Sequence, residues 1–409
     1  MQNKIIKALF IIILLFDVVF AKEVDLKSER YIIYNLNDNQ IIDENNSHDE
    51  VSIASLTKIM TVIVAIENIS DFNKKITITK DMINDIDWDV ATAGFKVGEK
   101  LTYDDLLYGA ILPSGADAVN ALAISVSGNK KDFVDLMNKK VSALKLKNTH
   151  FSNVIGLYDK ENYSSAYDMA QILKYALNNP KFKTVFETKK YTFSNGKTTK
   201  STIERYNSSD ASFITGAKTG YIKKAGYCLA TTATLNDVNY LLVTLNAFSS
   251  EGGVHIKDHI KTYNYFNNNY SYKNIVNKDD VVVTLKTKYS KEKELPIKAN
   301  IELKKYLKND FDSSKIKYVY DGIEKVSYFD DIGTKLGTIK IKYGDTVLDE
   351  FDLLLNQSLT FSLLSFLWTN KILSLVLIIV LLLIIRIIHV RIIKYRRRKR
   401  RIKRNKALN

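Results

Sequence analysis

An apolar segment near the end of the chain, followed directly by a basic tail, restricts the fold more than any other feature. Residues 372–385 carry no charge, although this run is shorter than the roughly 20 residues that a spanning helix needs. Arg386 can extend its charge toward the lipid headgroups, and the upstream segment 361–368, FSLLSFLW, can lie in the interface or lengthen the span. We therefore predict an amphipathic and transmembrane anchor over residues 357–390.

The positive charge of the chain is concentrated beside this anchor. The formal net charge is +15, and residues 386–409 contain twelve Lys or Arg and no acid, which leaves +3 for the remainder. A basic cluster that flanks an apolar helix is typical of the cytoplasmic side of a membrane. A nucleic-acid-binding arm would leave the adjacent apolar helix unexplained. We predict a cytoplasmic tail over residues 391–409, an extracytoplasmic body and no nucleic-acid partner.

The start of the chain has the pattern of a signal peptide. Lys4 and Lys7 precede an apolar run over residues 8–20, and Ala21 supplies a small residue for cleavage. Residues 1–21 are therefore predicted to direct export. The single cysteine, Cys228, excludes an internal disulfide framework, and its apolar neighbours favour a buried residue over a reactive thiol.

The body divides into a larger mixed part and a smaller β-rich part. A hairpin pattern near residues 31–43 comes first, several apolar-periodic helices follow, and a second hairpin turns at Asn236 and Asp237. This order predicts an α+β domain whose first and last strands share one sheet. Short alternating runs then predict an all-β module. We assign residues 22–275 to the main domain and residues 276–356 to the β-rich domain.

Ser55 and Lys58 are the first candidate catalytic residues. They lie three positions apart at the start of the apolar segment SLTKIMTVIVAIENI, which is expected to form a buried helix. An apolar setting disfavours a charged ammonium, so Lys58 can act as a base that takes the proton of Ser55. The spacing alone is weak evidence, because it recurs in polar or surface segments at Ser127, Ser142, Ser194, Ser290 and Ser314.

Two further motifs supply polar groups for a shared site. Ser114 lies at a helical break in LPSGADA, and Lys218-Thr219-Gly220 begins the second hairpin. A Lys-Thr pair at a strand edge is suited to bind a carboxylate, and Gly220 allows a substrate backbone to approach closely. The combination predicts an anionic acyl substrate.

These motifs, in this order, resemble those of penicillin-binding proteins and serine β-lactamases. The longer segments ASLTKIMT, LTYDDLLYGAILPSGADAVNALA, FSNVIGL and GAKTGYIKKAGYCLATTAT resemble the D-alanyl-D-alanine carboxypeptidases, the low-molecular-mass penicillin-binding proteins of serine peptidase family S11. The resemblance covers most of residues 30–270. It implies a transpeptidase-like domain with an antiparallel sheet and a helical cluster, followed by a β domain and an anchor.

The resemblance also implies a role for each motif residue. Ser55 would attack the bond between two terminal D-alanines of a peptidoglycan stem peptide, with Lys58 as base, and β-lactams would acylate the same serine. Ser114 would pass a proton to the leaving amine. The substrate-binding residues would be Lys218, Thr219, Gly220 and Tyr221, the last through its backbone N–H in the oxyanion hole. No metal or organic cofactor is implied.

One position departs from the family pattern. The usual Ser-Gly-Asn is Ser114-Gly115-Ala116 here, and alanine has no carboxamide to bond the lysine or the substrate. Asn120 lies on the same helix face, and helical side chains lean toward the N-terminus, so its carboxamide is a candidate replacement. The literal Ser-Gly-Asn at residues 127–129 occurs too late in the chain and is treated as unrelated to the site.

Three other residues receive weaker assignments. Arg205 lies roughly where such enzymes carry an additional carboxylate-binding arginine, although a surface arginine is the alternative. His255 and His259 are expected to be solvated on a surface helix, with no acid spacing that indicates a metal.

Two alternative functions remain open at this point. A β-lactamase of the same fold would need a deacylating glutamate between the second and third motifs, and the sequence offers no convincing one. A weakened binding or scaffold protein would explain Ala116 but not the retention of the four motif residues Ser55, Lys58, Ser114 and Lys218. The oligomeric state stays undetermined.

Overall fold

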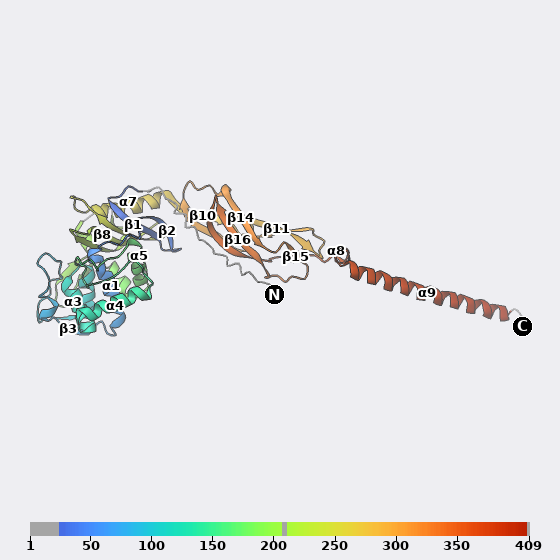
Figure 1. The fold of residues 1–409 in the computed structure, drawn as a ribbon, viewed down its shortest axis with the longest axis horizontal. Coiled ribbons are helices and arrows are strands. Elements are labelled where there is room, and N and C mark those ends of the chain that lie inside the picture. Colours follow the sequence, from blue (N-terminus) through green and yellow to red (C-terminus); the bar gives the residue numbers. More distant parts are fainter. Residues whose placement is uncertain (1–23, 207–210, 407–409) are drawn as a thin grey trace, which may run out of the picture. The chain divides into compact units, whose positions relative to one another are not determined.

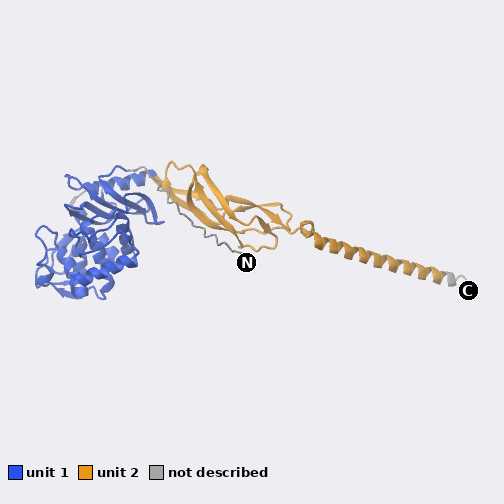
Figure 2. Cartoon of the chain, viewed as in Figure 1, with its two compact units in different colours: residues 1–269 blue, residues 270–409 orange. Residues whose placement is uncertain are grey.

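The computed structural model describes residues 24–206 and 211–406, which fall into two compact units divided after Asn269 (Figure 2). The predicted signal peptide lies outside these ranges. The first unit combines one main sheet with a cluster of helices, and the second contains short strands followed by two helices, α8 (Leu363–Thr369) and α9 (Lys371–Lys406) (Figure 1).

The first unit is built on a five-stranded antiparallel sheet of order β2-β1-β9-β8-β7. Its strands are β1 (Ser28–Asn35), β2 (Gln40–Asn45), β7 (Ile214–Ile222), β8 (Gly226–Leu235) and β9 (Val238–Ala247). The turn between β8 and β9 holds Asn236 and Asp237 at positive φ, the conformation that a tight hairpin requires. The α+β class and the shared sheet of first and last strands are therefore confirmed.

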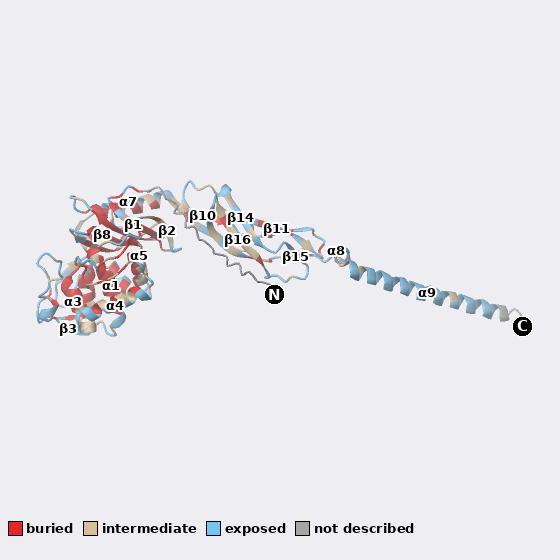
Figure 3. Cartoon of the chain, viewed as in Figure 1, coloured by how far each residue is buried: buried red, intermediate tan, exposed pale blue. Residues whose placement is uncertain are grey.

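Helices lie on both faces of this sheet, where α7 (Val254–Asn269) packs on β8 and β9 and α5 (Ala166–Leu177) packs on β1 and β9. The other helices of the first unit gather with α5 in a helical cluster, and they are α1 (Thr57–Asn68), α2 (Tyr103–Ile111), α3 (Ala116–Ser127), α4 (Lys130–Ala143) and α6 (Pro180–Glu187). Alternate residues of a strand point to opposite faces, so Ala230 and Val243 join the core with α1 while Thr231 and Thr244 face α7. Helix α1 is buried from Thr57 to Ile66, and Figure 3 colours it as core.

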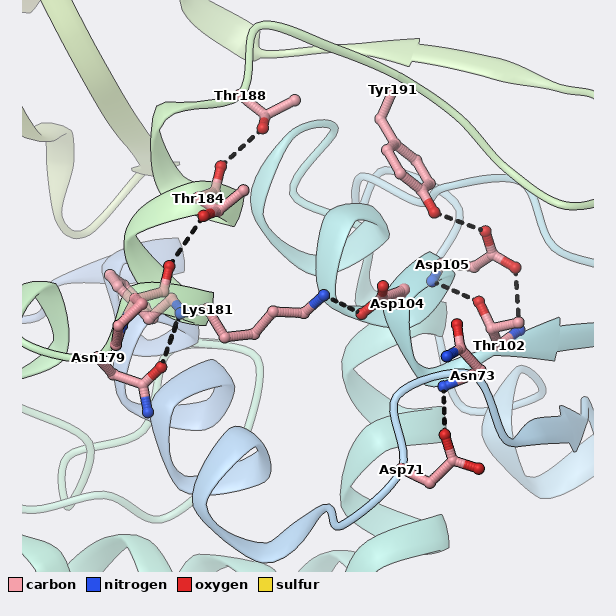
Figure 4. Close-up of polar contacts among 12 residues, drawn as sticks. Asp71, Asn73, Thr102, Asp104, Asp105, Asn179, Lys181, Thr184, Thr188 and Tyr191 are labelled. Atoms are coloured by element: carbon pink, nitrogen blue, oxygen red, sulfur yellow. Dashed lines mark hydrogen bonds and ion pairs between the residues drawn. The ribbon is translucent and has the colours of Figure 1, made fainter.

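Two small antiparallel pairs of strands also belong to the first unit. They are β3 (Lys75–Thr77) with β4 (Lys100–Thr102), and β5 (Lys190–Thr192) with β6 (Thr198–Lys200). Polar contacts hold them against the helices (Figure 4). Thr102 caps α2 by accepting from the Asp105 N–H, Tyr191 donates to the Asp105 carboxylate, and Lys181 of α6 pairs with Asp104 at 2.5 Å.

The prediction that His255 and His259 are solvated on a surface helix is wrong. His255 and His259 are 1% and 0% exposed, because α7 packs on β8 and β9. The two ring nitrogens of His259 lie 2.7 Å from the Thr231 hydroxyl and 2.9 Å from the Thr244 hydroxyl. Burial lowers the pKa of His255 to about 4 and holds the pKa of His259 well below its usual value, so both rings are neutral.

The second unit contains three small sheets around one apolar core. The strands are β10 (Tyr270–Val276), β11 (Val281–Lys288), β12 (Glu294–Lys298), β13 (Leu303–Lys308), β14 (Ile316–Gly322), β15 (Lys325–Ser327), β16 (Lys335–Tyr343) and β17 (Thr346–Leu354). Leu285, Ile297, Ile339 and Leu353 are central to the core. Helix α8 (Leu363–Thr369) and helix α9 (Lys371–Lys406) follow, and residues 371–403 of α9 are long and apolar enough to cross a membrane.

Candidate active site

Ser55 and Lys58 meet at the start of α1. Ser55 lies in the short 3-10 turn Ala54–Leu56, directly before the helix, and Lys58 occupies its first turn. The Lys58 Nζ donates to the Ser55 Oγ at 2.7 Å and to the Ile155 carbonyl at 2.7 Å. Lys58 is 1% exposed, whereas Ser55 is partly accessible, so the hydroxyl can receive a substrate while the amine stays buried.

The buried setting tunes Lys58 for proton transfer. Desolvation lowers the pKa of Lys58 to about 7, against the opposing effect of the Asp117 carboxylate, which raises it. A general base works best when its pKa lies near the working pH, because both its neutral fraction and its basicity are then appreciable. Ser55 can therefore lose its proton to Lys58 without a histidine.

A tight turn over residues 153–157 holds the second partner of Lys58. The Asn153 side chain accepts from the N–H groups of Gly156 and Leu157 at 2.7 and 3.1 Å, which places the Ile155 carbonyl toward the amine. Gly156 has a φ of +87°, and a Cβ there would lie 2.0 Å from the Ala54 carbonyl oxygen. Only glycine fits against the turn that carries Ser55. Reasoning from sequence missed this role, although the segment FSNVIGL was part of the resemblance.

Ser114 and Lys218 form the second hydroxyl–amine pair. Ser114 lies between α2 and α3 at a φ of +64°, a backbone conformation that non-glycine residues adopt mostly at specialised sites. The Lys218 Nζ, which is fully buried on β7, donates to the Ser114 Oγ at 2.8 Å and to the Thr219 carbonyl at 2.6 Å. This contact joins the helical cluster to the sheet.

The remaining motif residues follow Lys218 along β7. The Thr219 hydroxyl donates to Thr202 at 2.8 Å. A Cβ at Gly220 would lie 3.1 Å from the Ser55 nitrogen, so this point of the strand packs directly on the nucleophile turn. Tyr221 is 58% exposed and its ring lies 4.6 Å from that of Tyr227. The structure thus brings together β7 and the start of α1, as the motifs predicted.

Ala116 and Asn120 lie on α3, and both are buried. The Ala116 N–H donates to the Ala91 carbonyl at 2.8 Å. The Asn120 carboxamide donates to the Met82 carbonyl at 3.2 Å and borders a pocket of about 330 Å³ that Asn153 and Ile155 also line. The role of Asn120 in the reaction stays a prediction, and the structure relates it to Lys58 only through Ile155, which lines the same pocket and accepts from the Lys58 amine.

The literal Ser-Gly-Asn at residues 127–129 ends one helix and caps the next. Gly128 ends α3 in the left-handed conformation, and the Asn129 side chain caps α4 by accepting from the Asp132 N–H at 2.8 Å. The side chain of Arg205 lies outside the described part of the chain. Among residues 24–206 and 211–406, no His, Cys, Asp and Glu side chains are grouped as a metal site would require.

The site has one serine paired with a buried lysine and a second serine bonded to another lysine, and it lies in a domain with an antiparallel sheet and helices on both faces. These features define the class of penicillin-binding serine hydrolases. The sequence model of the D-alanyl-D-alanine carboxypeptidases, peptidase family S11, matches residues 17–249. The chain belongs to this family.

Several relatives support the assignment. The chain is 29% identical to the D-alanyl-D-alanine carboxypeptidase DacF of Bacillus subtilis over 327 residues, which cover 76% of this chain and 80% of that protein. It is 37% identical to the carboxypeptidase of Streptomyces strain K15, over 45% of this chain and 68% of that protein. Escherichia coli DacA is 33% identical, and the match spans 58% of its length.

Solved structures share the fold over most of the chain. The carboxypeptidase DacD of Francisella tularensis has a TM-score of 0.65 and 20% identity, covering 83% of this chain and 95% of that one. Penicillin-binding protein 6B of Escherichia coli has a TM-score of 0.63 and 23% identity, covering 81% and 96%. The fold is thus that of penicillin-binding proteins.

We expect acylation by penicillin to rise with pH around a midpoint of about 7. Below that pH Lys58 is protonated and cannot accept the Ser55 proton, so the rate falls about tenfold per pH unit; above it the rate levels off. Stopped-flow acylation with a fluorescent penicillin from pH 5 to 9 measures this. A rate that still rises about tenfold per pH unit up to pH 9, without levelling off, would contradict a depressed pKa of Lys58.

We expect Gly156→Ala to reduce acylation at least about tenfold, because the added Cβ must displace the Ala54 carbonyl and with it the Ser55 turn. Gly196→Ala is the matched control. Gly196 also has a positive φ, of +83°, but its Cβ would meet nothing within 4 Å. The control should lose about 1 kcal/mol of stability and keep its acylation rate. Equal acylation by both variants would refute the steric explanation.

Proposed function

We propose that this chain is a serine-type D-alanyl-D-alanine carboxypeptidase that removes the terminal D-alanine from peptidoglycan stem peptides and is acylated by β-lactams. The single observation that carries the assignment is the 2.7 Å contact between Ser55 and the buried Lys58, whose pKa is lowered to about 7, in a chain of this family. Such a pair is an activated nucleophile with its own base.

Acylation begins when the Ser55 Oγ attacks the carbonyl carbon of the penultimate D-alanine and its proton passes to Lys58. The backbone N–H groups of Ser55 and Tyr221 stabilise the negative oxygen of the tetrahedral intermediate. The close packing of Gly220 on the Ser55 nitrogen supports this placement. The carbon–nitrogen bond then breaks, and the proton that Lys58 took from Ser55 passes through the Ser114 hydroxyl to the leaving amine, which leaves Lys58 neutral again.

Deacylation returns the enzyme to its starting state. Water attacks the ester carbonyl, gives up a proton to Lys58, and releases the shortened peptide as its carboxylic acid with Ser55 protonated again. Lys218 and Thr219 bind the terminal carboxylate of the substrate, since one carries a positive charge and the other a hydroxyl. The Lys218 amine donates to the Ser114 hydroxyl at 2.8 Å, which supports a fixed position of this hydroxyl for the proton transfer to the leaving amine.

The two alternative functions find less support. The relatives compared above are named as D-alanyl-D-alanine carboxypeptidases. A decayed scaffold would not be expected to keep both hydroxyl–amine pairs at 2.7 and 2.8 Å. Alanine at position 116 lacks the carboxamide of the family's usual asparagine. Lys58 still has a polar partner besides Ser55, because its amine donates to the Ile155 carbonyl.

We propose that the enzyme is exported and held on the cytoplasmic membrane by α9, with its catalytic domain on the extracytoplasmic side. The apolar part of α9 and the basic residues after it support this orientation. Residues 1–21 would be removed, residues 357–390 would form the anchor, and residues 391–409 the cytoplasmic tail. Residues 22–275 and 276–356 are the domains proposed from sequence, and the pairing of β10 with β13 moves the boundary between them to Asn269.

We expect the full-length chain in detergent to release D-alanine from a pentapeptide ending in D-Ala-D-Ala, and Ser55→Ala to abolish the release. The matched control is Ser314→Ala, which removes an exposed serine with the same spacing to a lysine and should keep full activity. A D-alanine assay coupled to D-amino-acid oxidase measures the product. Release by the Ser55→Ala variant at the rate of the unchanged enzyme would refute the proposal.

The predicted role of Asn120 has its own test. If its carboxamide replaces the one missing at position 116, Asn120→Ala should slow penicillin acylation by about ten- to a hundredfold. Asn138→Ala is a suitable comparison, because Asn138 is a structural amide that bonds the Phe151 backbone. Unchanged acylation in Asn120→Ala would show that Asn120 has no part in the reaction and only a structural role through its contact with Met82.

A further inference from the structure

An aromatic cluster attaches α8 to the β-rich unit. The rings of Tyr289 and Phe366 lie 5.1 Å apart, those of Tyr289 and Phe329 lie 5.6 Å apart, and Phe361 lies 6.0 Å from Phe366. Phe366 belongs to α8, whereas Tyr289 and Phe329 follow strands β11 and β15. Aromatic pairs at these distances stabilise their contact beyond simple burial.

Backbone hydrogen bonds hold the same junction. The Ser362 N–H donates to the Tyr289 carbonyl at 3.0 Å, and the Lys291 N–H donates to the Thr360 carbonyl at 2.9 Å. The Ser362 hydroxyl then caps α8 by accepting from the Ser365 N–H. Helix α8 is therefore attached to the β-rich unit through side chains and backbone.

The outer side of this junction is apolar and exposed. We name it the juxtamembrane patch, and its exposed fractions range from 37% at Phe361 to 83% at Trp368. Its members come from the loop 328–332 and the segment 361–368, and they are Tyr328, Phe329, Ile332, Phe361, Leu363, Leu364 and Trp368. Ring contacts of Tyr328 and Phe329 with Phe361 bring the loop beside the segment 361–368. Exposed apolar side chains that gather in this way, on a unit with its own closed core, mark a site of interaction.

The position of the patch along the chain indicates what covers it. Helix α8 ends at Thr369, the next residue Asn370 has a φ of −100° and a ψ of 66° that are not helical, and α9 begins at Lys371. The upstream segment is thus a separate helix and does not lengthen the span. A short apolar helix with an aromatic residue, next to a spanning helix, is suited to the membrane interface.

The charges around the patch are of both signs. Asp330 and Asp331 lie within the loop, and the Asp330 carboxylate accepts from the Ser327 N–H at 2.7 Å. Lys288 lies 5.4 Å from the centre of the Tyr289 ring, and Lys371 opens α9. This balance does not favour anionic headgroups, so apolar contact with the outer part of the acyl chains is the expected mode of binding.

We propose that the juxtamembrane patch lies in the outer interface of the bilayer, so that the β-rich unit itself contacts lipid through the loop 328–332. The proposal rests on the membrane anchoring proposed for α9 and adds a second, independent contact. Together with α8, the loop fixes this end of the unit at the membrane surface, because the aromatic cluster links the two segments.

Tryptophan fluorescence tests the proposal in the full-length chain. The chain has two tryptophans, Trp88 and Trp368, and both are replaced by phenylalanine. Phe329→Trp then reports on the loop. Val347→Trp is the matched control, because Val347 is 46% exposed in the same unit and lies by Tyr343, at the opposite end of the β16–β17 hairpin from Lys335 and Leu354.

The variants are inserted into phosphatidylcholine vesicles with or without brominated acyl chains. The proposal expects the Phe329→Trp variant to show blue-shifted emission that brominated lipid quenches about twofold or more, and the Val347→Trp variant to show little quenching. Absence of quenching at position 329, or equal quenching at both positions, would overturn it. A blue shift without quenching would indicate a protein partner and would also overturn it.

Two measurements on the same samples distinguish this proposal from the membrane anchoring and the catalytic activity proposed above. Flotation of the vesicles reports whether α9 anchors the chain, and a chain that does not float overturns both the anchor and the patch. D-alanine release reports on the catalytic domain independently of either. Far-UV circular dichroism, unchanged between the two variants, confirms that both are folded.

Discussion

The burial of the Lys58 amine is the interaction on which the catalytic domain depends. A charged ammonium in an apolar core is costly, and the protein reduces this cost by lowering the pKa of Lys58 to about 7 and by giving the amine two oxygen acceptors. One acceptor is the Ser55 hydroxyl, the nucleophile proposed above. The other is a backbone carbonyl, which cannot ionise and so leaves the amine free to gain and lose a proton.

The rest of the site can be understood from this arrangement. The turn at residues 153–157 must approach the Ser55 turn closely, and Gly156 is the residue that permits it. Strand β7 must pack on the same turn from another direction, where Gly220 leaves room. Its Lys218 then reaches Ser114 and connects the sheet to the helical cluster. Three segments far apart in sequence therefore depend on the position of one short turn.

Much of the fold and the site could be predicted from local patterns. The hairpin at Asn236 and Asp237, the buried α1 and the amphipathic helices follow from periodicity and turn chemistry, which are local properties. Ser55 and Lys58 could be paired because residues three apart share a helix face. His255 and His259 could not be placed, because the face of α7 that is buried depends on the threonines of β8 and β9.

By itself, the sequence determined the fold class, the order of the three motifs and the apolar segment that can span a membrane, and it singled out Ser55 and Lys58 as the candidate nucleophile and base. Only the tertiary structure decided that the Ile155 carbonyl holds Lys58, that Asn120 bonds Met82, and that an aromatic cluster joins α8 to the β-rich unit. The physical reason is the range of the contacts. Those read from sequence join residues within one or two turns, whereas Ile155 lies 97 positions from Lys58, and only folding brings them within hydrogen-bonding distance.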